Sequence, residues 1–160
     1  MALRMPRSVR LRGASETGAT VVRVDRRTKN LTKRLQPGEI AVIDHEDIDR
    51  VSADALVSCR PAAVVNASRS ISGRYPNQGP ELILGAGIPI IDAVGHEVMS
   101  AVRGGYRLRV ADGALLDGNR EVARGQVLEL DQVRAEMVQA RSAMSEQIEH
   151  FATNTMDYLR

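Results

Sequence analysis

The sequence has few of the residues that mark specialised classes of protein. It contains one cysteine, Cys59, no tryptophan, and only 2% aromatic residues. A single cysteine excludes an internal disulfide framework. No stretch approaches the roughly 18 consecutive apolar residues of a membrane-spanning helix, and the basic N-terminus lacks the apolar run of a secretory signal. We therefore expect a soluble, cytoplasmic chain.

What the sequence does contain is typical of a folded domain. Hydrophobic residues make up 43% and charged residues 26% of the 160 residues, which argues against wholesale disorder and against a collagen-like fibre. The length fits one domain, or one domain with an appendage. The net charge of +2 hides an uneven distribution. Residues 1–34 carry ten basic and two acidic side chains, whereas residues 35–160 carry twelve basic and eighteen acidic ones.

Two stretches hold most of the N-terminal basic charge. Residues 1–20 contain four arginines and two glycines without apolar periodicity, and we predict a flexible basic arm. Residues 25–34 contain five cations in ten positions, and we predict a polar loop. Segments that bind nucleic acid usually interleave aromatic side chains or carry a recognisable motif. Neither is present, so we expect no nucleic-acid partner.

Short apolar runs that favour strands alternate with helical patterns in the next part of the chain. The alternation predicts parallel βαβ units. Asp47 is placed to cap the first of the helices. The expected strands cover residues 40–43, 62–65 and 88–91, and the expected helices cover residues 48–58, 80–86 and 95–102.

After residue 105 the pattern changes to short strands separated by Asp-Gly turns. Asp112-Gly113 and Asp117-Gly118 lie between alternating stretches, which is a strong signal for β-hairpins. We therefore predict that a C-terminal antiparallel meander completes the region 21–125, which forms one small α/β domain.

Residues 131–160 have the pattern of one long amphipathic helix. Its apolar or small residues recur with a mean spacing near 3.7, closer to an 11-residue than to a 7-residue repeat, so paired helices would be nearly straight. At 1.5 Å per residue the helix is about 45 Å long. It either folds back over the sheet or projects from the domain, and we predict that it projects and forms a homodimer or connects to a further domain. The apolar or small positions are Val133, Met137, Ala140, Met144, Ile148, Phe151, Thr155 and Leu159.

The best candidate for a binding site is the polar loop 66–79, which lies between an expected strand and an expected helix. Ligands of open α/β sheets bind outside the carboxyl ends of the strands, and a connection of 14 residues is unusually long. It either binds an anion, such as a phosphate, a carboxylate or a nucleotide, or is an ordinary solvated connection. In the first case Arg74 pairs charge, the hydroxyl and amide groups donate hydrogen bonds, and the glycines allow close approach of the backbone. The loop residues concerned are Asn66, Ser68, Ser70, Ser72, Gly73, Arg74, Tyr75, Asn77 and Gly79.

Further residues are expected to line the same site. Asp44 directly follows one expected parallel strand, Asp92 ends another, and Asn66 lies at the end of the strand between them. We therefore expect these three side chains at one edge of the sheet, which we call the rim. The cations Arg26, Arg27 and Lys29 supply positive charge. The acidic residues at 44–47 suit a helix N-terminus better than a metal, and no nucleophile–base arrangement or pair of carboxylates is evident. We therefore assign no catalytic residue, no metal and no cofactor, and treat Cys59 as a small buried residue.

Residues 38–125 resemble the swivelling phosphohistidine domain of phosphoenolpyruvate-utilising enzymes. The likeness lies in PGEIAVID at 37–44, AAVVN at 62–66, GIPIIDAVG at 87–95 and the closing hairpins. It implies a small swivelling domain with a β/β/α arrangement. The phosphorylated histidine of that family would fall near Gln78, and there is no histidine between His45 and His96. Phosphoryl transfer through histidine is therefore not expected.

A second resemblance covers residues 21–160 and is to the SteA family of actinobacterial cytokinetic ring proteins, which is thiamin-pyrophosphokinase-like. It implies a role in cell division and cell-wall separation with a membrane-bound division partner. Members of that family continue into a thiamin-pyrophosphokinase-like domain and transmembrane helices. The segments that carry the likeness are VDRRTKNLTKRL at 24–35, AVIDH at 41–45, DALVSC at 54–59, VVNAS at 64–68, SISGRYPNQGP at 70–80, AGIPIID at 86–92 and NTMDYL at 154–159.

Three functional hypotheses follow. The leading one is a non-catalytic domain that binds an anionic or nucleotide-type ligand and interacts with partners in cell division. The second is one part of a thiamin-pyrophosphokinase-like diphosphotransferase whose catalytic domain lies outside these residues. The third is a purely structural dimerisation module.

Overall fold

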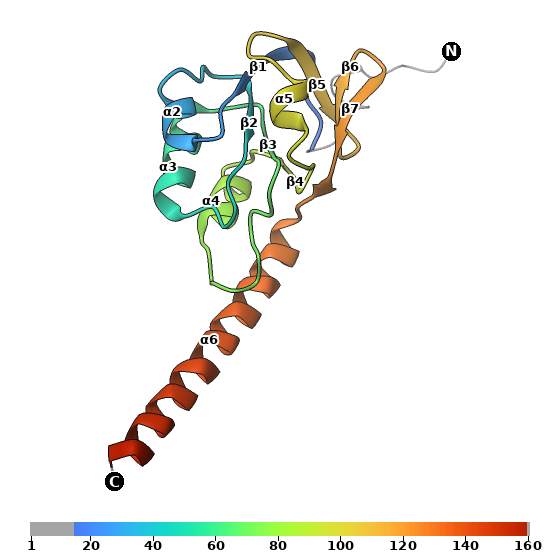
Figure 1. The fold of residues 1–160 in the computed structure, drawn as a ribbon. Coiled ribbons are helices and arrows are strands. Elements are labelled where there is room, and N and C mark those ends of the chain that lie inside the picture. The colour runs from blue at the N-terminus through green and yellow to red at the C-terminus, as the bar shows by residue number, and fades with distance from the viewer. Residues whose placement is uncertain (1–14, 160) are drawn as a thin grey trace.

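The computed structural model describes residues 15–159, with side chains described as far as residue 155. Figure 1 shows a mixed sheet with helices packed against it and one long helix that leaves the sheet. The strands lie in the order β7-β6-β5-β1-β2-β3-β4-β8. The strands are β1 (Thr20–Val24), β2 (Ile40–Ile43), β3 (Ala63–Asn66), β4 (Ile90–Asp92), β5 (Arg107–Ala111), β6 (Ala114–Asp117), β7 (Arg120–Arg124) and β8 (Gln126–Val127). The helices are α2 (Thr28–Thr32), α3 (Arg50–Cys59), α4 (Gly79–Gly85), α5 (Val98–Ala101) and α6 (Leu130–Leu159).

The centre of the sheet is parallel and the flanks are antiparallel. Strands β1 to β4 pair in parallel, and β5, β6 and β7 form the expected antiparallel meander beside β1. Every residue of β2 and β3 is buried, as expected of strands covered on both faces. The predicted α/β fold with a C-terminal meander and a long final helix is confirmed.

Each face of the parallel strands has its own hydrophobic core. On one face, α2, α3 and α4 contribute Leu31, Leu56 and Ile83. On the other face, α5 and the curled meander contribute residues such as Val98 and Leu115. The parallel strands are therefore a middle layer, and their carboxyl ends emerge together between two covering layers.

Two local predictions were wrong. Residues 25–34 are not all loop, because α2 lies within them and buries Thr28 and Leu31, whose i, i+3 spacing places them on one face. Asp47 does not cap α3. Its backbone has φ +55, and the helix begins three residues later at Arg50.

The N-terminal segment is attached to the sheet over part of the expected flexible arm. The backbone N–H of Thr17 donates to the carbonyl oxygen of Val110 at 2.8 Å, and the N–H of Val110 donates to Thr17 Oγ1 at 2.9 Å. Thr20 then begins β1. Residues 1–14 of that arm lie outside the described residues.

Among the residues up to Thr155, helix α6 packs against the sheet and helices only at its start. Val133, Met137 and Ala140 are buried, whereas every residue from Arg141 to Thr155 is exposed. Figure 1 shows the rest of the helix projecting away from the sheet, as predicted. Within residues 15–159, no helix combines the length and apolar composition needed to cross a membrane.

Candidate functional site at the carboxyl edge of the parallel strands

The polar residues expected on one rim do lie at one edge of the sheet. Asn66 ends β3 and lies beside Ile43, the last residue of β2, so Asp44 directly follows that pair. Asp92 ends β4, the next strand. Since parallel strands end at the same edge, these three side chains and the start of the loop 66–79 share one rim.

Asn66 holds this rim together from inside the protein. It is completely buried, and its Oδ1 accepts hydrogen bonds from the backbone N–H groups of His45 and Ser68 at 3.0 and 3.1 Å. Its Nδ2 donates to the carbonyl oxygen of His45 and to Ser70 Oγ at 2.8 and 2.9 Å. Both acceptor positions and both donors of the amide are thus in use. Asn66 therefore positions the loop, and has no bonding capacity left for a ligand.

Ser70 and Asp92 form a second internal contact. Ser70 donates from both its backbone N–H and its Oγ to Asp92 Oδ1, at 2.9 and 2.6 Å. Burial raises the pKa of Asp92, and this effect outweighs the two hydrogen bonds from Ser70 that favour the ionised carboxylate. Both residues fasten the loop to the end of β4.

Asp47 fastens the far part of the same loop. Its carboxylate accepts hydrogen bonds from Ser72 N–H at 2.7 Å, from Ser72 Oγ at 2.9 Å and from Asn77 Nδ2 at 2.8 Å. Ser72 and Asn77, expected to donate to a ligand, therefore donate to Asp47. This partner was missed because nothing in the sequence shows that residue 47 and residues 72–77 meet.

The two loop glycines have different roles. A Cβ atom on Gly79 would lie 2.1 Å from the carbonyl oxygen of Ile48, so Gly79 allows α4 to pack closely on the chain that precedes α3. Gly73 has φ +88 and open space around it, so it provides a turn conformation that side chains other than glycine adopt poorly. Of the two, only Gly73 lies on an open surface.

The accessible part of the rim is built around Asp44. Its Oδ1 accepts a hydrogen bond from Ser68 Oγ at 2.5 Å, and its Oδ2 lies 2.9 Å from Nδ1 of His96. Burial by itself would raise the pKa of Asp44, but the hydrogen bonds from Ser68 and His96 and the charges of His96 and Arg26 together lower it. Asp44 therefore remains ionised and holds the imidazole of His96 in one orientation.

His96 is not among the residues expected at this site, because it falls within the expected helix 95–102. Its side chain is 73% exposed, and Nδ1 faces Asp44, which leaves Nε2 on the solvent side. The signal that could have found it is its place just after β4, because residues that follow parallel strands line this edge.

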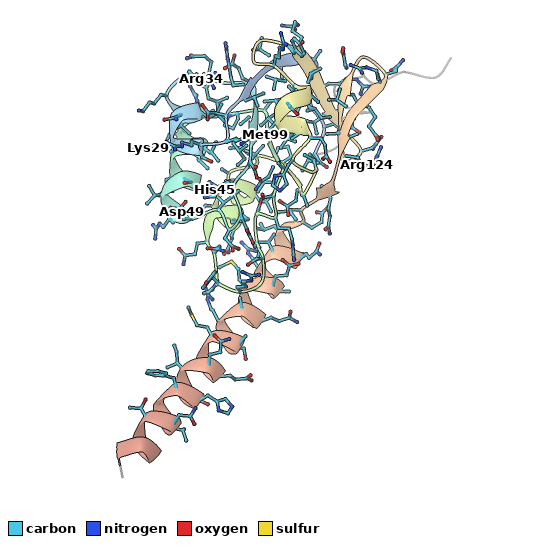
Figure 2. The ribbon with its side chains drawn as sticks, viewed as in Figure 1. Lys29, Arg34, His45, Asp49, Met99 and Arg124 are labelled. Atoms are coloured by element: carbon cyan, nitrogen blue, oxygen red, sulfur yellow. The ribbon has the colours of Figure 1, made fainter. Side chains whose placement is uncertain are left out.

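His45 connects the rim to the helical layer. Its Nδ1 lies 2.8 Å from Thr28 Oγ1 of α2, and its Nε2 lies 3.7 Å from Asp49 Oδ1 before α3. Figure 2 shows His45 and Asp49 near one another on the side of α2 and α3. The imidazole thus links the end of β2 to α2 and to the start of α3, and its side chain is 26% exposed.

The cations expected around the site are arranged unevenly. Arg26 lies close enough to Asp44 to lower the pKa of that carboxyl group. Arg27 precedes α2, and Lys29 is exposed on that helix. In the loop, Arg74 and Tyr75 are exposed at the tip. Of the four cations expected at the site, Arg26 is therefore the one with an electrostatic effect on a rim residue, Asp44.

The loop 66–79 also contacts α6. Ile71 is 3% exposed and packs in one cluster with Val133 and Met137 of that helix. Through Ser68 and Ser70 the loop is fastened to the rim, and one residue later it is packed against the start of α6. The loop therefore joins the rim to the projecting helix.

The described residues contain no group of three or more His, Cys, Asp or Glu side chains arranged to hold a metal ion. No protein-family model, curated protein or solved structure matches the chain.

Proposed function

We propose that residues 20–128, here called the body, form a non-catalytic domain that binds an anionic small molecule at the rim and couples this binding to α6. The observation that carries the proposal is the packing of Ile71 between the rim and the helix. Ser70 is bonded to Asp92, and the next residue packs against Val133 and Met137. A ligand that moves or stiffens this part of the loop acts directly on the start of α6.

The charges at the rim favour an anion with a phosphate or carboxylate group. Arg26 provides a permanent positive charge, and the contact between Asp44 and Nδ1 of His96 leaves Nε2 of that imidazole facing solvent. The guanidinium group of Arg26 can form charge-assisted hydrogen bonds with such an anion, which are shorter and stronger than hydrogen bonds between neutral groups. A nucleotide fits this description through its phosphates.

The resemblance to cytokinetic ring proteins supports placing this binding and coupling function in cell division. In that setting the projecting helix would transmit the state of the rim to the rest of a division assembly with a membrane-bound partner.

The second candidate, a purely structural module, is favoured by the internal use of the polar loop groups. Asn66, Ser70, Ser72 and Asn77 bond to the protein itself. Under this candidate the loop only supports α6, and the rim binds nothing.

Thermal unfolding in the presence of anions separates the two candidates. We expect inorganic phosphate, ADP or a sugar nucleotide at millimolar concentration to stabilise the protein, because a ligand at 100 times its Kd adds about 2.7 kcal/mol. Arg26→Ala and His96→Ala should each weaken the affinity for the anion at least tenfold and so reduce the shift in unfolding temperature. Arg120→Ala, in an exposed arginine of the meander, is the matched control and should behave as the unmodified chain.

The same samples test the coupling. Hydrogen exchange should slow in residues 66–79 and in the first turns of α6 when the anion binds. The absence of stabilisation by all of these anions would reject the proposal and leave the structural module. Turnover of ATP by this chain would instead support a diphosphotransferase.

A further inference from the structure

The projecting part of α6 carries an uncovered apolar stripe. Met144, Ile148 and Phe151 are 38%, 62% and 75% exposed, and Thr155 continues the same line. We call these four residues the stripe. Figure 2 shows side chains along this part of the helix with no other element beside them. Large apolar side chains gathered on one exposed line mark an interaction surface.

The stripe continues a line that the body already covers. From Met137 the apolar or small positions follow spacings of 3, 4, 4, 3 and 4, through Ala140 and the four stripe residues. This is an 11-residue repeat of 3.67 residues per turn, close to the 3.6 of a straight helix, so the line does not wind around α6. The same face is therefore buried in the body at Met137 and Ala140 and uncovered from Met144 onward.

We propose that a second copy of this chain covers the stripe, with the two α6 helices packed antiparallel. The charges around the stripe favour a copy of itself. At 100° per residue, Glu146, Glu149 and His150 lie at least 120° from Met144, on the far side of the helix. The near side between residues 143 and 155 holds only uncharged side chains. Arg141, at the start of the projecting part, lies about 60° from Met144, and its two copies fall at opposite ends of an antiparallel pair. Two such surfaces therefore meet without like-charge repulsion.

The position of the body decides the orientation. Ile71, Leu84 and Leu128 lie against the stripe side of α6 around Val133 and Met137. In a parallel pair both bodies would have to fit between the two helices at the same height. In an antiparallel pair the bodies lie at opposite ends, and the partner helix continues the cover that the body begins. Setting Ile148 against Phe151 and Met144 against Thr155 places Ala140, the last residue of the line that the body covers, opposite Leu159 of the partner helix.

The contact is expected to be modest in strength. Each copy offers about 28 Å of helix beyond residue 140, and a phenylalanine buries about 150–250 Å² when covered. The total surface area buried in the pair is therefore about 1,200 Å², at the small end of specific interfaces. Association should therefore depend on concentration in the micromolar range. The proposal does not require that the rim binds an anion.

Sedimentation equilibrium of the full chain tests the association. We expect a monomer–dimer equilibrium, and Ile148→Glu should weaken it at least tenfold because it buries two charges at the centre of the contact. Val138→Glu is the matched control, since Val138 is 63% exposed on the same helix but lies about a third of a turn from Met144. Its dimer Kd should stay within about threefold. Circular dichroism of both variants should show an unchanged helix content at monomer concentrations. A monomer at several hundred micromolar, or equal loss in both variants, would overturn the proposal.

Disulfide cross-linking tests the orientation in a Cys59→Ser background. Ile148→Cys should link when mixed with Phe151→Cys under mild copper–phenanthroline oxidation, because a disulfide needs Cα atoms within about 7 Å. Met144→Cys should link only when mixed with Thr155→Cys. Linking of Met144→Cys to itself would mean parallel helices and would overturn the antiparallel assignment.

Discussion

Asn66 and Ser70 are completely buried polar side chains, and every hydrogen bond of the Asn66 amide is made within the protein. A buried polar group left unpaired costs about 1–3 kcal/mol. The loop 66–79 therefore keeps one arrangement relative to β3 and β4. Polar residues that look like ligand donors in the sequence fix the backbone of the loop instead. The side chains that remain available to contact a ligand are those of Asp44, His96 and Arg26.

The two glycines of α4 provide a test of close packing. Gly79→Ala should destabilise the protein by about 1–3 kcal/mol, because its Cβ would overlap the backbone of Ile48. Gly85→Ala, in the same helix, meets nothing within 4 Å and should be neutral or stabilising by about 0.5–1 kcal/mol. Urea unfolding of both variants measures the difference. Equal effects would contradict the packing role of Gly79.

Two aspartates at the rim should give the stability opposite dependences on pH. The pKa of Asp92 is raised above its ordinary 3.8, so its contribution is fully present at low pH and is lost as the pH rises through the folded-state pKa. The pKa of Asp44 is lowered, so its contribution is present above about pH 4 and is lost as the pH falls.

Unfolding free energies at pH 4 and pH 7 check these signs. Asp92→Asn should become more stable relative to the unmodified chain on going from pH 4 to pH 7, and Asp44→Asn should become less stable over the same interval. The same sign in both variants would show that one of the two environments is wrongly described.

Among the elements, the loop 66–79 and α6 depend on one another. Ile71→Ala should remove about 2–4 kcal/mol of packing between them, as large-to-small changes in a core do. Hydrogen exchange should then speed up over residues 66–79 and 130–140. Tyr75→Ala in the same loop is the control, because Tyr75 is 55% exposed. Exchange that changes equally in both variants would indicate that Ile71 does not link the loop to the helix.

For the whole molecule, the body should fold without the projecting half of α6. A chain ending at Ala140 keeps Val133 and Met137 buried and should unfold within about 2 °C of the full chain at low micromolar concentration, where association contributes little. A chain ending at Leu128 loses both residues, each worth about 1.5–3 kcal/mol when fully buried, and should unfold several degrees lower. Thermal unfolding followed by circular dichroism distinguishes the two. A similar loss in both chains would mean that residues 141–160 also stabilise the body.

The sequence by itself determined the alternation of parallel strands and helices between residues 40 and 102, the hairpins and the long helix, because these depend on local patterns. Alternating apolar runs favour strands, Asp-Gly turns favour hairpins, and a 3.7-residue spacing favours a helix. It also placed Asp44, Asn66 and Asp92 on one rim, since parallel strands end at one edge. The prediction of Asp47 as the cap of α3 was wrong, and α2 was missed. A short charged segment gives no helical pattern when its only buried residues are Thr28 and Leu31.

Only the tertiary structure decided which polar groups remain available. Asp47 meets Ser72 and Asn77 across 25 and 30 residues of chain, and Asp44 meets His96 across 52. No local pattern encodes such contacts, because they arise when separate βα units pack side by side. The same packing covers α6 as far as Ala140 and leaves the stripe exposed. The sequence determined that α6 has an apolar face, and the fold decided where that face lacks a partner.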